Sequence, residues 1–331
     1  MSKTDLIMNQ LDQRVDRRNE RRKFFKTAGG FAVGATAGAV LGACSSGSNT
    51  AVAQNPPSGK VNLDIEILNF ALQLEYLEAE FYSWAAFGMG LPASSTSGQG
   101  TPGATTGGAP VPFSDPLVRR YANEIAKDEI AHVNFLRTAL GSAAVAKPAI
   151  NISGTDPNGS FSTAARAAGV ISGPASVFNP YADDNSFLLG AYIFEDVGVT
   201  LYKGASPLVT SPVFLEAAAG LLAAEAYHAG IVRTVLTAKG VATPSLITAA
   251  GQISDARDTL DGGTDQDQGI ATIGTGNAAE SNIFPSDTNG LAYSRTVQQG
   301  LNIVYLKSGT GQTSGGFFPA GLNGPTGFRT S

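Results

Sequence analysis

Four segments of the chain place apolar residues at helical spacing. A capping serine with a proline close behind opens the second and fourth segments, at Ser114 and Ser211, and a glycine ends each of the four. At 1.5 Å of rise per residue each segment spans roughly 30–43 Å, which suits one helix of a bundle. The segments cover about residues 62–87, 114–140, 184–203 and 211–240. The pattern therefore predicts an all-α protein built on a four-helix bundle.

The connections between these segments predict the order of the helices. About seven residues join the third helix to the fourth, so those two should be antiparallel neighbours. An insert without periodicity, residues 88–113, joins the first helix to the second. The second and third are joined by residues 141–183, which are enough to return the chain to the other end of the bundle. We therefore expect an up-down-down-up bundle with a long crossover.

Beyond residue 240 the sequence becomes rich in Gly, Thr, Asn and Asp. One amphipathic piece near residues 295–306 predicts a short fifth helix, and Phe317, Phe318 and Pro319 are typical of residues that anchor a loop on a core. We therefore expect the bundle to cover residues 61–240. Residues 241–331 should form a loop-rich C-terminal extension that packs on it.

The N-terminal segment, residues 1–44, resembles an export signal. Arg21-Arg22 follows a charged stretch and precedes a weakly apolar run, as in twin-arginine signals, which carry folded proteins. The end of the segment resembles a lipobox that would be lipidated at Cys44, with cleavage after Ala53 as the alternative. Residues 45–60 predict a flexible linker. We expect export by the twin-arginine route to the cell envelope or periplasm, with membrane contact only through a lipid.

Charge and cysteine content narrow the picture further. Residues 1–44 carry eight of the 22 basic and four of the 27 acidic residues, so the remainder has a net charge of about −9. Nucleic acid and anionic lipid surfaces need a basic face, so neither is expected as a partner. The chain has one cysteine, which excludes a disulfide within it.

The chain's only two histidines carry the candidate chemistry. Each follows a glutamate by three residues, as Glu129/His132 in the second helix and Glu225/His228 in the fourth. Positions i and i+3 lie on the same side of a helix, so one carboxylate and one imidazole can reach a common cation. In a bundle, two such motifs and one Glu from each remaining helix form a dinuclear metal site.

The first and third helices can supply the other two carboxylates. Glu75 is the candidate in the first helix, with Glu78 one turn further along as its competitor, and Glu195 is the candidate in the third. Tyr82 and Tyr202 follow Glu75 and Glu195 by seven residues, or two turns, and so share their faces. Two roles suit these tyrosines: shuttling an electron or proton near the metals, or donating a hydrogen bond to a ligating carboxylate.

Four more residues are placed by helical phase. Tyr192, three residues before Glu195, is a further candidate for the tyrosine roles. Arg137 and Arg233 recur at the same offset after the two motifs, as traces of an internal duplication, and both are expected on the surface. Glu80 is also expected to be solvated.

These motifs resemble the ferritin-like superfamily, and in particular the exported ferritin-like domain proteins that include the desiccation-related proteins. The resembling stretches are residues 74–82, 128–132 and 225–228. The resemblance implies a ferritin-like four-helix bundle that holds two metal ions, with iron favoured over manganese. The implied ligands are Glu75, Glu129, His132, Glu195, Glu225 and His228.

The implied function is a di-iron protein that reacts with dioxygen or peroxide, either oxidising Fe(II) or removing peroxide. Carboxylate ligands suit such a centre, and two adjacent metals can supply two electrons together. Dimanganese with a catalase-like reaction is the alternative metal. A non-catalytic envelope module with a structural or desiccation-protective role is the alternative function. Whether the chain is an enzyme, and whether it forms a homodimer, stays open at this point.

Overall fold

The computed structural model describes residues 58–262, 265–324 and 326–331. The signal segment, most of the expected linker and the residues Arg21, Arg22, Cys44 and Ala53 lie outside this range. The first described helix, α2 (Ser58–Phe87), begins inside the stretch expected to be linker. Among the described residues, no helix combines the length and the apolarity that a bilayer crossing needs.

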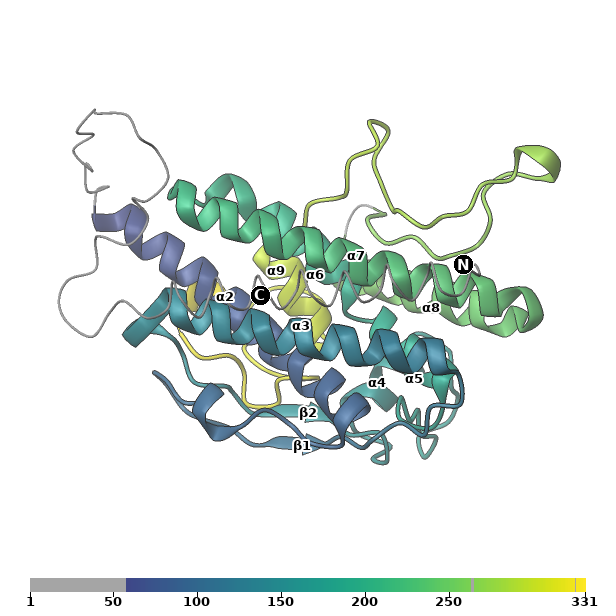
Figure 1. Cartoon of the computed structure of the whole chain (residues 1–331), viewed down its shortest axis with the longest axis horizontal. Coiled ribbons are helices and arrows are strands. Elements are labelled where there is room, and N and C mark those ends of the chain that lie inside the picture. The colour runs from purple at the N-terminus through teal and green to yellow at the C-terminus, as the bar shows by residue number, and fades with distance from the viewer. Residues whose placement is uncertain (1–57, 263–264, 325) are drawn as a thin grey trace, which may run out of the picture. The chain divides into compact units, whose positions relative to one another are not determined.

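Four long helical stretches form the predicted bundle (Figure 1). Besides α2 they are α3 (Pro116–Leu140), the pair α5 (Asp184–Tyr192) and α6 (Glu195–Ala205), and α7 (Pro212–Ala242). Helix α2 packs mainly on α3, and α6 packs mainly on α7. The starts of α3 and α7 carry the expected caps, because the side chains of Asp115 and Ser211 accept hydrogen bonds from N–H groups of the first turn.

Hydrogen bonds at one end of the bundle show how the helices run. Asn69, in the first half of α2, donates to the carbonyl of Ala143, just after α3, at 3.0 Å. Asp64, near the start of α2, accepts from the N–H of Ser211, just before α7, at 2.9 Å. This end therefore holds the starts of α2 and α7 and the end of α3.

The opposite end of the bundle shows the complementary set. Asp184, at the start of α5, accepts from the N–H of Ser114, just before α3, at 3.1 Å. Lys239, near the end of α7, lies 2.9 Å from the carboxylate of Asp115. Helices α3, α5 and α6 thus run opposite to α2 and α7, which confirms the up-down-down-up order.

The third helix is interrupted, although the sequence predicted one helix over residues 184–203. Helix α5 ends at Tyr192, and α6 begins at Glu195. At the interruption the N–H groups of Phe194 and Val197 bond to carbonyls three residues back, at 3.0 and 2.9 Å. This tighter winding is typical of a local break, and such breaks are frequent at functional sites.

The two long connections fold over the outside of α2 and α3. The insert contains η1 (Ala93–Ser95) and β1 (Thr105–Gly107), and the crossover contains η2 (Gly141–Ala143), β2 (Ile150–Ile152) and α4 (Ser160–Ala167). Strands β1 and β2 pair in parallel, with Thr105 opposite Ile150. The insert and the crossover therefore hold each other in place.

The C-terminal extension contains the expected short helix and a longer one that the sequence analysis missed. Helix α9 (Val297–Tyr305) confirms the amphipathic piece, and Phe317 and Phe318 are fully buried, as expected of anchoring residues. The missed helix is α8 (Pro244–Asp261), which packs against α5, α7 and α9. It was missed because Thr, Ser, Gly and Asp are frequent in its sequence and its apolar face is narrow. The remaining short elements are η3 (Ser206–Leu208), η4 (Gly276–Ala278) and η5 (Thr326–Phe328).

Candidate metal centre

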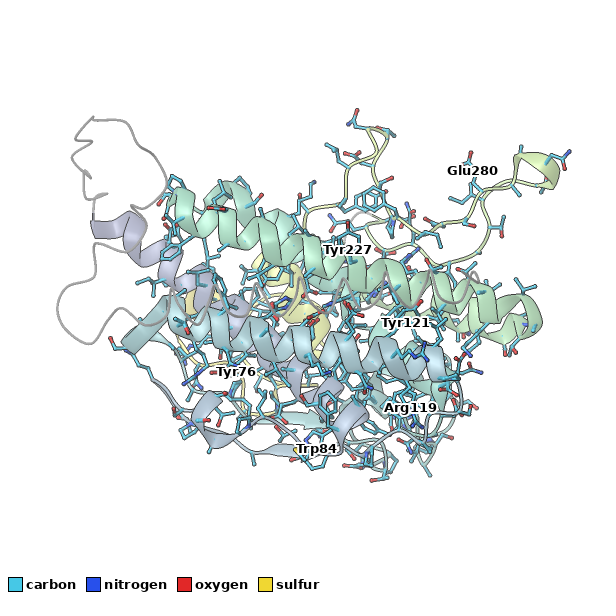
Figure 2. The ribbon with its side chains drawn as sticks, in the orientation of Figure 1. Tyr76, Trp84, Arg119, Tyr121, Tyr227 and Glu280 are labelled. Carbon is cyan, nitrogen blue, oxygen red and sulfur yellow. The ribbon has the colours of Figure 1, made fainter. Side chains whose placement is uncertain are left out.

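The six predicted ligands meet inside the bundle. They come from all four of its helical stretches and are all buried: Glu75 from α2, Glu129 and His132 from α3, Glu195 from the first turn of α6, and Glu225 and His228 from α7. Only one face of α7 is buried at this point. Tyr227, which lies between Glu225 and His228 in the sequence, is 75% exposed on the outside of the helix (Figure 2).

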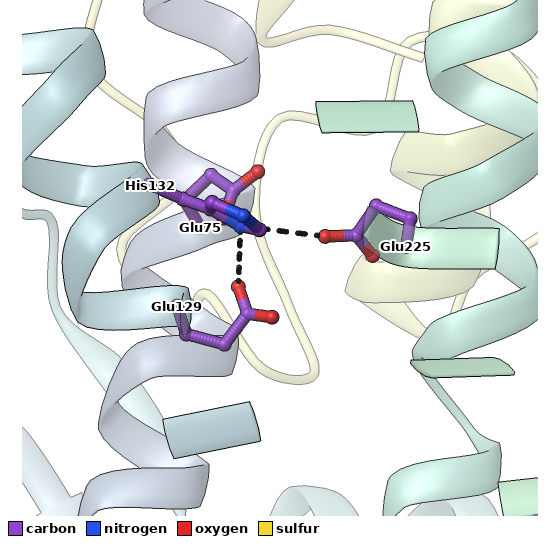
Figure 3. Close-up of side chains that lie close together, drawn as sticks. All are labelled: Glu75, Glu129, His132 and Glu225. Atoms are coloured by element: carbon purple, nitrogen blue, oxygen red, sulfur yellow. Dashed lines mark hydrogen bonds and ion pairs between the residues drawn. The ribbon is translucent and has the colours of Figure 1, made fainter. Parts of the chain in front are cut away.

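One half of the cluster is centred on His132 (Figure 3). Its Nδ1 atom lies 3.1 Å from Oε2 of Glu75, 3.3 Å from Oε2 of Glu129 and 3.7 Å from Oε1 of Glu225. One ligand atom from each of these four residues falls within a mutual distance of 4.8 Å. This is a compact set of one imidazole and three carboxylates.

The other half is centred on His228. Its Nδ1 atom lies 2.9 Å from Oε1 of Glu129 and 3.8 Å from Oε2 of Glu195. Ligand atoms of Glu195, Glu225 and His228 form a second group within 4.8 Å. Glu225 belongs to both groups, and Glu129 turns one oxygen to each histidine. Glu129 and Glu225 therefore lie between the two halves of the cluster. The ring centroids of His132 and His228 are 6.1 Å apart.

The carboxylate oxygens and imidazole nitrogens of this cluster are better suited to binding a pair of cations than to hydrogen bonding with one another. Within the described residues, five buried atoms of the cluster make no hydrogen bond: Oε1 of Glu129, Oε2 of Glu195, both carboxylate oxygens of Glu225, and Nδ1 of His228. Oε1 of Glu129 and Nδ1 of His228 face each other at 2.9 Å without bonding geometry. Buried polar atoms without partners are costly, and a shared metal ion would satisfy them.

Two tyrosines bond to the outer carboxylates in a reciprocal arrangement. The hydroxyl of Tyr82 on α2 donates to Glu195 on α6, and the hydroxyl of Tyr202 on α6 donates to Glu75 on α2. Spacing predicted each tyrosine on the face of the glutamate of its own helix, but each hydroxyl bonds instead to the glutamate of the opposite helix. Each hydroxyl fixes one carboxylate oxygen and leaves the other free to face the cluster.

Burial sets the pKa values of the cluster's carboxyl groups. It raises the pKa of Glu75 to about 7 and that of Glu195 to about 8, and nearby Glu129 adds to both shifts. Burial and the neighbouring carboxylates also raise the pKa of Glu225 well above its ordinary value. For Glu129, burial acts upward, but the two histidines outweigh it and hold the pKa well below its ordinary value.

The histidines show the matching effect. Burial acts to lower the pKa of His132, but Glu75 and Glu129 outweigh it and raise the pKa to about 11. Burial likewise opposes the shift of His228, whose pKa is nevertheless raised well above its ordinary value by Asp128, Glu129 and Glu195. In the metal-free cluster, bound protons therefore balance the carboxylate charge that two cations would otherwise balance.

Asp128 is a site residue that the sequence analysis missed. Its Oδ2 atom lies 3.6 Å from Nε2 of His228, on the side of the ring that faces away from the cluster. Carboxylates in this position orient metal-binding histidines. The only sequence signal was its place immediately before Glu129, which carries no information about a contact with α7.

The structure also separates Glu75 from its competitors on α2. Glu75 belongs to the ligand group around His132, whereas Glu78 belongs to neither group, although it is buried and its pKa is raised by burial and by the cluster's carboxylates. The expectation that Glu80 is solvated was wrong. The insert covers it, and its Oε1 atom lies 3.6 Å from Lys147 Nζ.

Gly198 provides room for one of the central carboxylates. A Cβ atom at this position would come within 2.5 Å of Oε2 of Glu225. The bare backbone of α6 therefore lets Glu225 reach the middle of the cluster.

An apolar cavity of about 50 Å³ adjoins the cluster. Glu75, Glu78 and Tyr202 line it next to the centre, and elsewhere its walls are mainly aliphatic residues of α2, α6 and α9. Its volume is enough for a few molecules the size of water. The histidines and the two central glutamates do not line it, so it lies beside the cluster rather than within it.

The four-helix bundle and its internal cluster of Glu and His side chains define a protein of the ferritin type. The family model described as a ferritin-like domain matches residues 63–238, and the chain belongs to this family. The matched region begins within the first two turns of α2, includes α3, α5 and α6, and ends one turn before the end of α7.

Two relatives are similar to the chain over most of their lengths. The chain is 30% identical over 282 residues to the ferritin-like catalase Nec2 of Nesocodon mauritianus, covering 81% of this chain and 86% of the relative. It is 33% identical over 253 residues to the desiccation-related protein PCC13-62 of Craterostigma plantagineum, covering 72% of this chain and 76% of the relative. No solved structure matches the chain at a significant level.

Proposed function

We propose that this protein holds two metal ions in the cluster and uses them to remove hydrogen peroxide. The observation that carries the proposal is the set of buried Glu and His donor atoms that face a common centre without hydrogen-bond partners. Similarity to a protein named as a ferritin-like catalase supports peroxide as the substrate. Iron is the proposed metal, with manganese as the alternative, because one imidazole and several carboxylates per ion suit both.

The ligand assignment follows the two halves. Glu75 and His132 would hold one ion, Glu195 and His228 the other, and Glu129 would bridge them. Glu225 is within reach of both and would be the second bridge. When bound, the two ions would each change oxidation state by one, and so supply or accept the two electrons of one peroxide.

The protein's own residues prepare this chemistry in three ways. Tyr82 and Tyr202 hold the outer carboxylates in one orientation, so that the site needs little rearrangement on loading. Burial keeps bulk water away from the centre. The apolar cavity beside Glu75 gives a neutral molecule such as peroxide or dioxygen a place next to the site. Dioxygen is also the product when two peroxide molecules yield two water molecules.

Metal analysis combined with peroxide turnover tests the proposal. Wild-type protein should contain close to two Fe or Mn ions per chain and should release one dioxygen for every two peroxide molecules consumed. Glu129→Gln should lower metal affinity by at least about 100-fold, because it weakens the bridge that serves both halves. The measurements are elemental analysis and a dioxygen electrode.

Glu124→Gln is the matched control, since Glu124 stands on the exposed side of the same helix. It should keep both ions and the full rate. Wild-type protein without metal after expression in iron- and manganese-supplemented cells would exclude the proposed function.

A second candidate function is protective rather than catalytic. Similarity to a protein named as desiccation-related supports it. In that case metal-free and metal-loaded protein should preserve a drying-sensitive test enzyme equally well, and Glu129→Gln should have no effect. A protective effect that needs the metal would favour the catalytic proposal.

We also propose that the protein is exported by the twin-arginine route and anchored through lipid on Cys44. The paired arginines Arg21 and Arg22 and the small residues before Cys44 support this. Replacing both arginines with lysine should retain the protein in the cytoplasm, and Cys44→Ser should remove incorporation of labelled palmitate. Export of the double-lysine variant at the wild-type level would contradict the proposal.

A further inference from the structure

The interruption of the third helix lies directly before a proposed metal ligand. Helix α5 ends at Tyr192, and Glu195 is the first residue of α6. The last carbonyls of one helix and the first N–H groups of the next have no partner within their own helix. Glu195 therefore stands where the backbone has the least support from its own helix. By contrast, Glu75 stands in the middle of the continuous helix α2.

Arg257 of the missed helix α8 bonds to this interruption from outside the bundle. Its Nη1 atom donates to the carbonyl of Tyr192 at 2.7 Å, and its guanidinium lies 4.8 Å from the centre of the Tyr192 ring. Its Nη2 atom lies 3.1 Å from Asp196, the residue next to Glu195, and its Nε atom lies 2.8 Å from Asp267. One side chain thus holds the end of α5 and the start of α6 together.

Arg233 of α7 reaches the same point from the other side. Its Nη1 atom lies 2.8 Å from Oδ2 of Asp196 and 3.1 Å from the hydroxyl of Tyr192. Its Nη2 atom donates to the carbonyls of Gly269 and Asn282 in the extension, at 2.8 and 2.6 Å. The expectation of a surface role for Arg233 was wrong, because the extension covers it. Tyr192 lies in this outer group and not beside the metal-binding cluster.

Arg295 fixes the body of α6 to the extension. It pairs with Asp261 at 2.9 Å and with Asp267, and its Nη1 atom donates to the hydroxyl of Thr200 at 2.6 Å. Its backbone N–H also donates to the carbonyl of Thr200. A Cβ atom on Gly204 would collide with the carbonyl of Arg295, so the glycine permits this close approach.

Together these side chains form a buried network with equal numbers of positive and negative groups, which we call the arginine clamp. Each member is less than a tenth exposed. Removing one charge from such a network leaves its partner buried and unpaired, which is strongly unfavourable. The members are Arg233, Arg257, Arg295, Asp196, Asp261 and Asp267.

We infer that the arginine clamp positions Glu195, and that the C-terminal extension is therefore part of the metal centre. The inference rests on the proposed two-metal function. Asp196 is held on the outside of α6, while its neighbour Glu195 faces the cluster, so fixing one fixes the backbone that carries the other. Arg257 is a positioning residue in this scheme. Its loss should affect the His228 half of the centre and leave the His132 half intact, because Glu195 belongs only to the former.

Metal titration of Arg257→Met tests this asymmetry. Full-length wild-type protein, stripped of metal and titrated with Mn(II), should bind two ions and show the electron paramagnetic resonance signal of a coupled pair. Arg257→Met should bind one ion with wild-type affinity and the second at least about 10-fold more weakly, with the signal of an isolated Mn(II). Arg257→Lys keeps the positive charge but loses the planar fork of the guanidinium, and it should restore part of the second affinity.

Arg166→Met is the matched control. Arg166 donates to carbonyls of the crossover loop, such as those of Pro157 and Ser176 at 2.9 Å, and touches no member of the clamp. It should leave both affinities unchanged.

The outcomes separate the inference from the function on which it rests. Two equally tight ions in Arg257→Met would overturn the inference alone. Equal weakening of both ions in Arg257→Met and Arg257→Lys would also overturn it, because the clamp would then stabilise the bundle as a whole. Wild-type protein that binds no Mn(II) or Fe(II) would overturn the proposed function as well.

Discussion

At the scale of single residues, the crossed tyrosine bonds connect the two outer carboxylates, Glu75 and Glu195, to each other's helices. Tyr82 and Tyr202 were candidates either for moving an electron or proton or for holding a carboxylate. Their hydrogen bonds to Glu195 and Glu75 favour the holding role. In the outer hydrogen-bond layer of a metal site, such a donor orients its ligand and tunes how strongly it binds.

Tyr202→Phe should therefore weaken metal binding selectively. We expect the affinity of the ion nearer Glu75 to fall by about 10-fold, since loss of such a donor usually costs 10–100-fold. Two-step Mn(II) titration by calorimetry measures the effect. Tyr227→Phe is the control, because Tyr227 is exposed on the outside of α7. A Tyr202→Phe protein that binds both ions normally but loses turnover would favour the electron- or proton-shuttling role.

The candidate site was largely predictable from residue spacing, because most of its residues are marked by neighbours only a few positions away in the sequence. A Glu three residues before each of two histidines requires only the helical repeat, and the structure brings all four residues together. Asp128 could not be predicted in the same way. Its partner, His228, lies on another helix, and the contact depends on how α3 and α7 pack.

At the scale of elements, the four-helix bundle was predictable because each long helix carries its own periodicity and end signals. The interruption between α5 and α6 was not, since residues 192–195 contain no proline or glycine to mark it. Tertiary contacts with Arg233 and Arg257 stabilise the broken form instead. Helix α8 was missed for a related reason: its polar composition is compensated by packing against helices that are distant in sequence.

The insert shows a similar limit. Its Gly-rich sequence indicated loop, and most of it is loop, yet its strand β1 pairs with β2 of the crossover. A parallel pair of three residues per strand depends on a partner far along the chain, which local periodicity cannot reveal. The burial of Glu80 follows from this covering layer.

At the scale of the whole molecule, the titration of the buried cluster makes the free energy of unfolding of the metal-free protein depend on pH. Glu75 and Glu195 have pKa values of about 7 and 8 in the folded metal-free protein, above the ordinary 4.5. The stability that their bound protons contribute is fully present below pH 4.5 and is lost as pH rises through 7–8. His132 adds a loss in the same direction, between pH 6.5 and about 11.

Metal-free protein should therefore melt at a lower temperature at pH 8 than at pH 5. In metal-loaded protein the ions replace these protons, so the decline over this range should be absent. Binding at a ligand concentration 100 times the dissociation constant adds about 2.7 kcal/mol per site, or roughly 5–10 °C in melting temperature. Scanning calorimetry at both pH values, with and without Mn(II), measures both effects. Parallel pH curves for the two forms would contradict the prediction.

The arginine clamp also bears on when during synthesis the centre can form. All six proposed ligands precede residue 229, whereas Arg257, Asp267 and Arg295 are made later. A nascent chain that already contains every ligand still lacks the residues that hold Glu195 in place. Under the proposed two-metal function, loading of both ions would wait until translation is nearly complete, and a premature stop after α7 would yield a product with all six proposed ligands and only one well-held metal position.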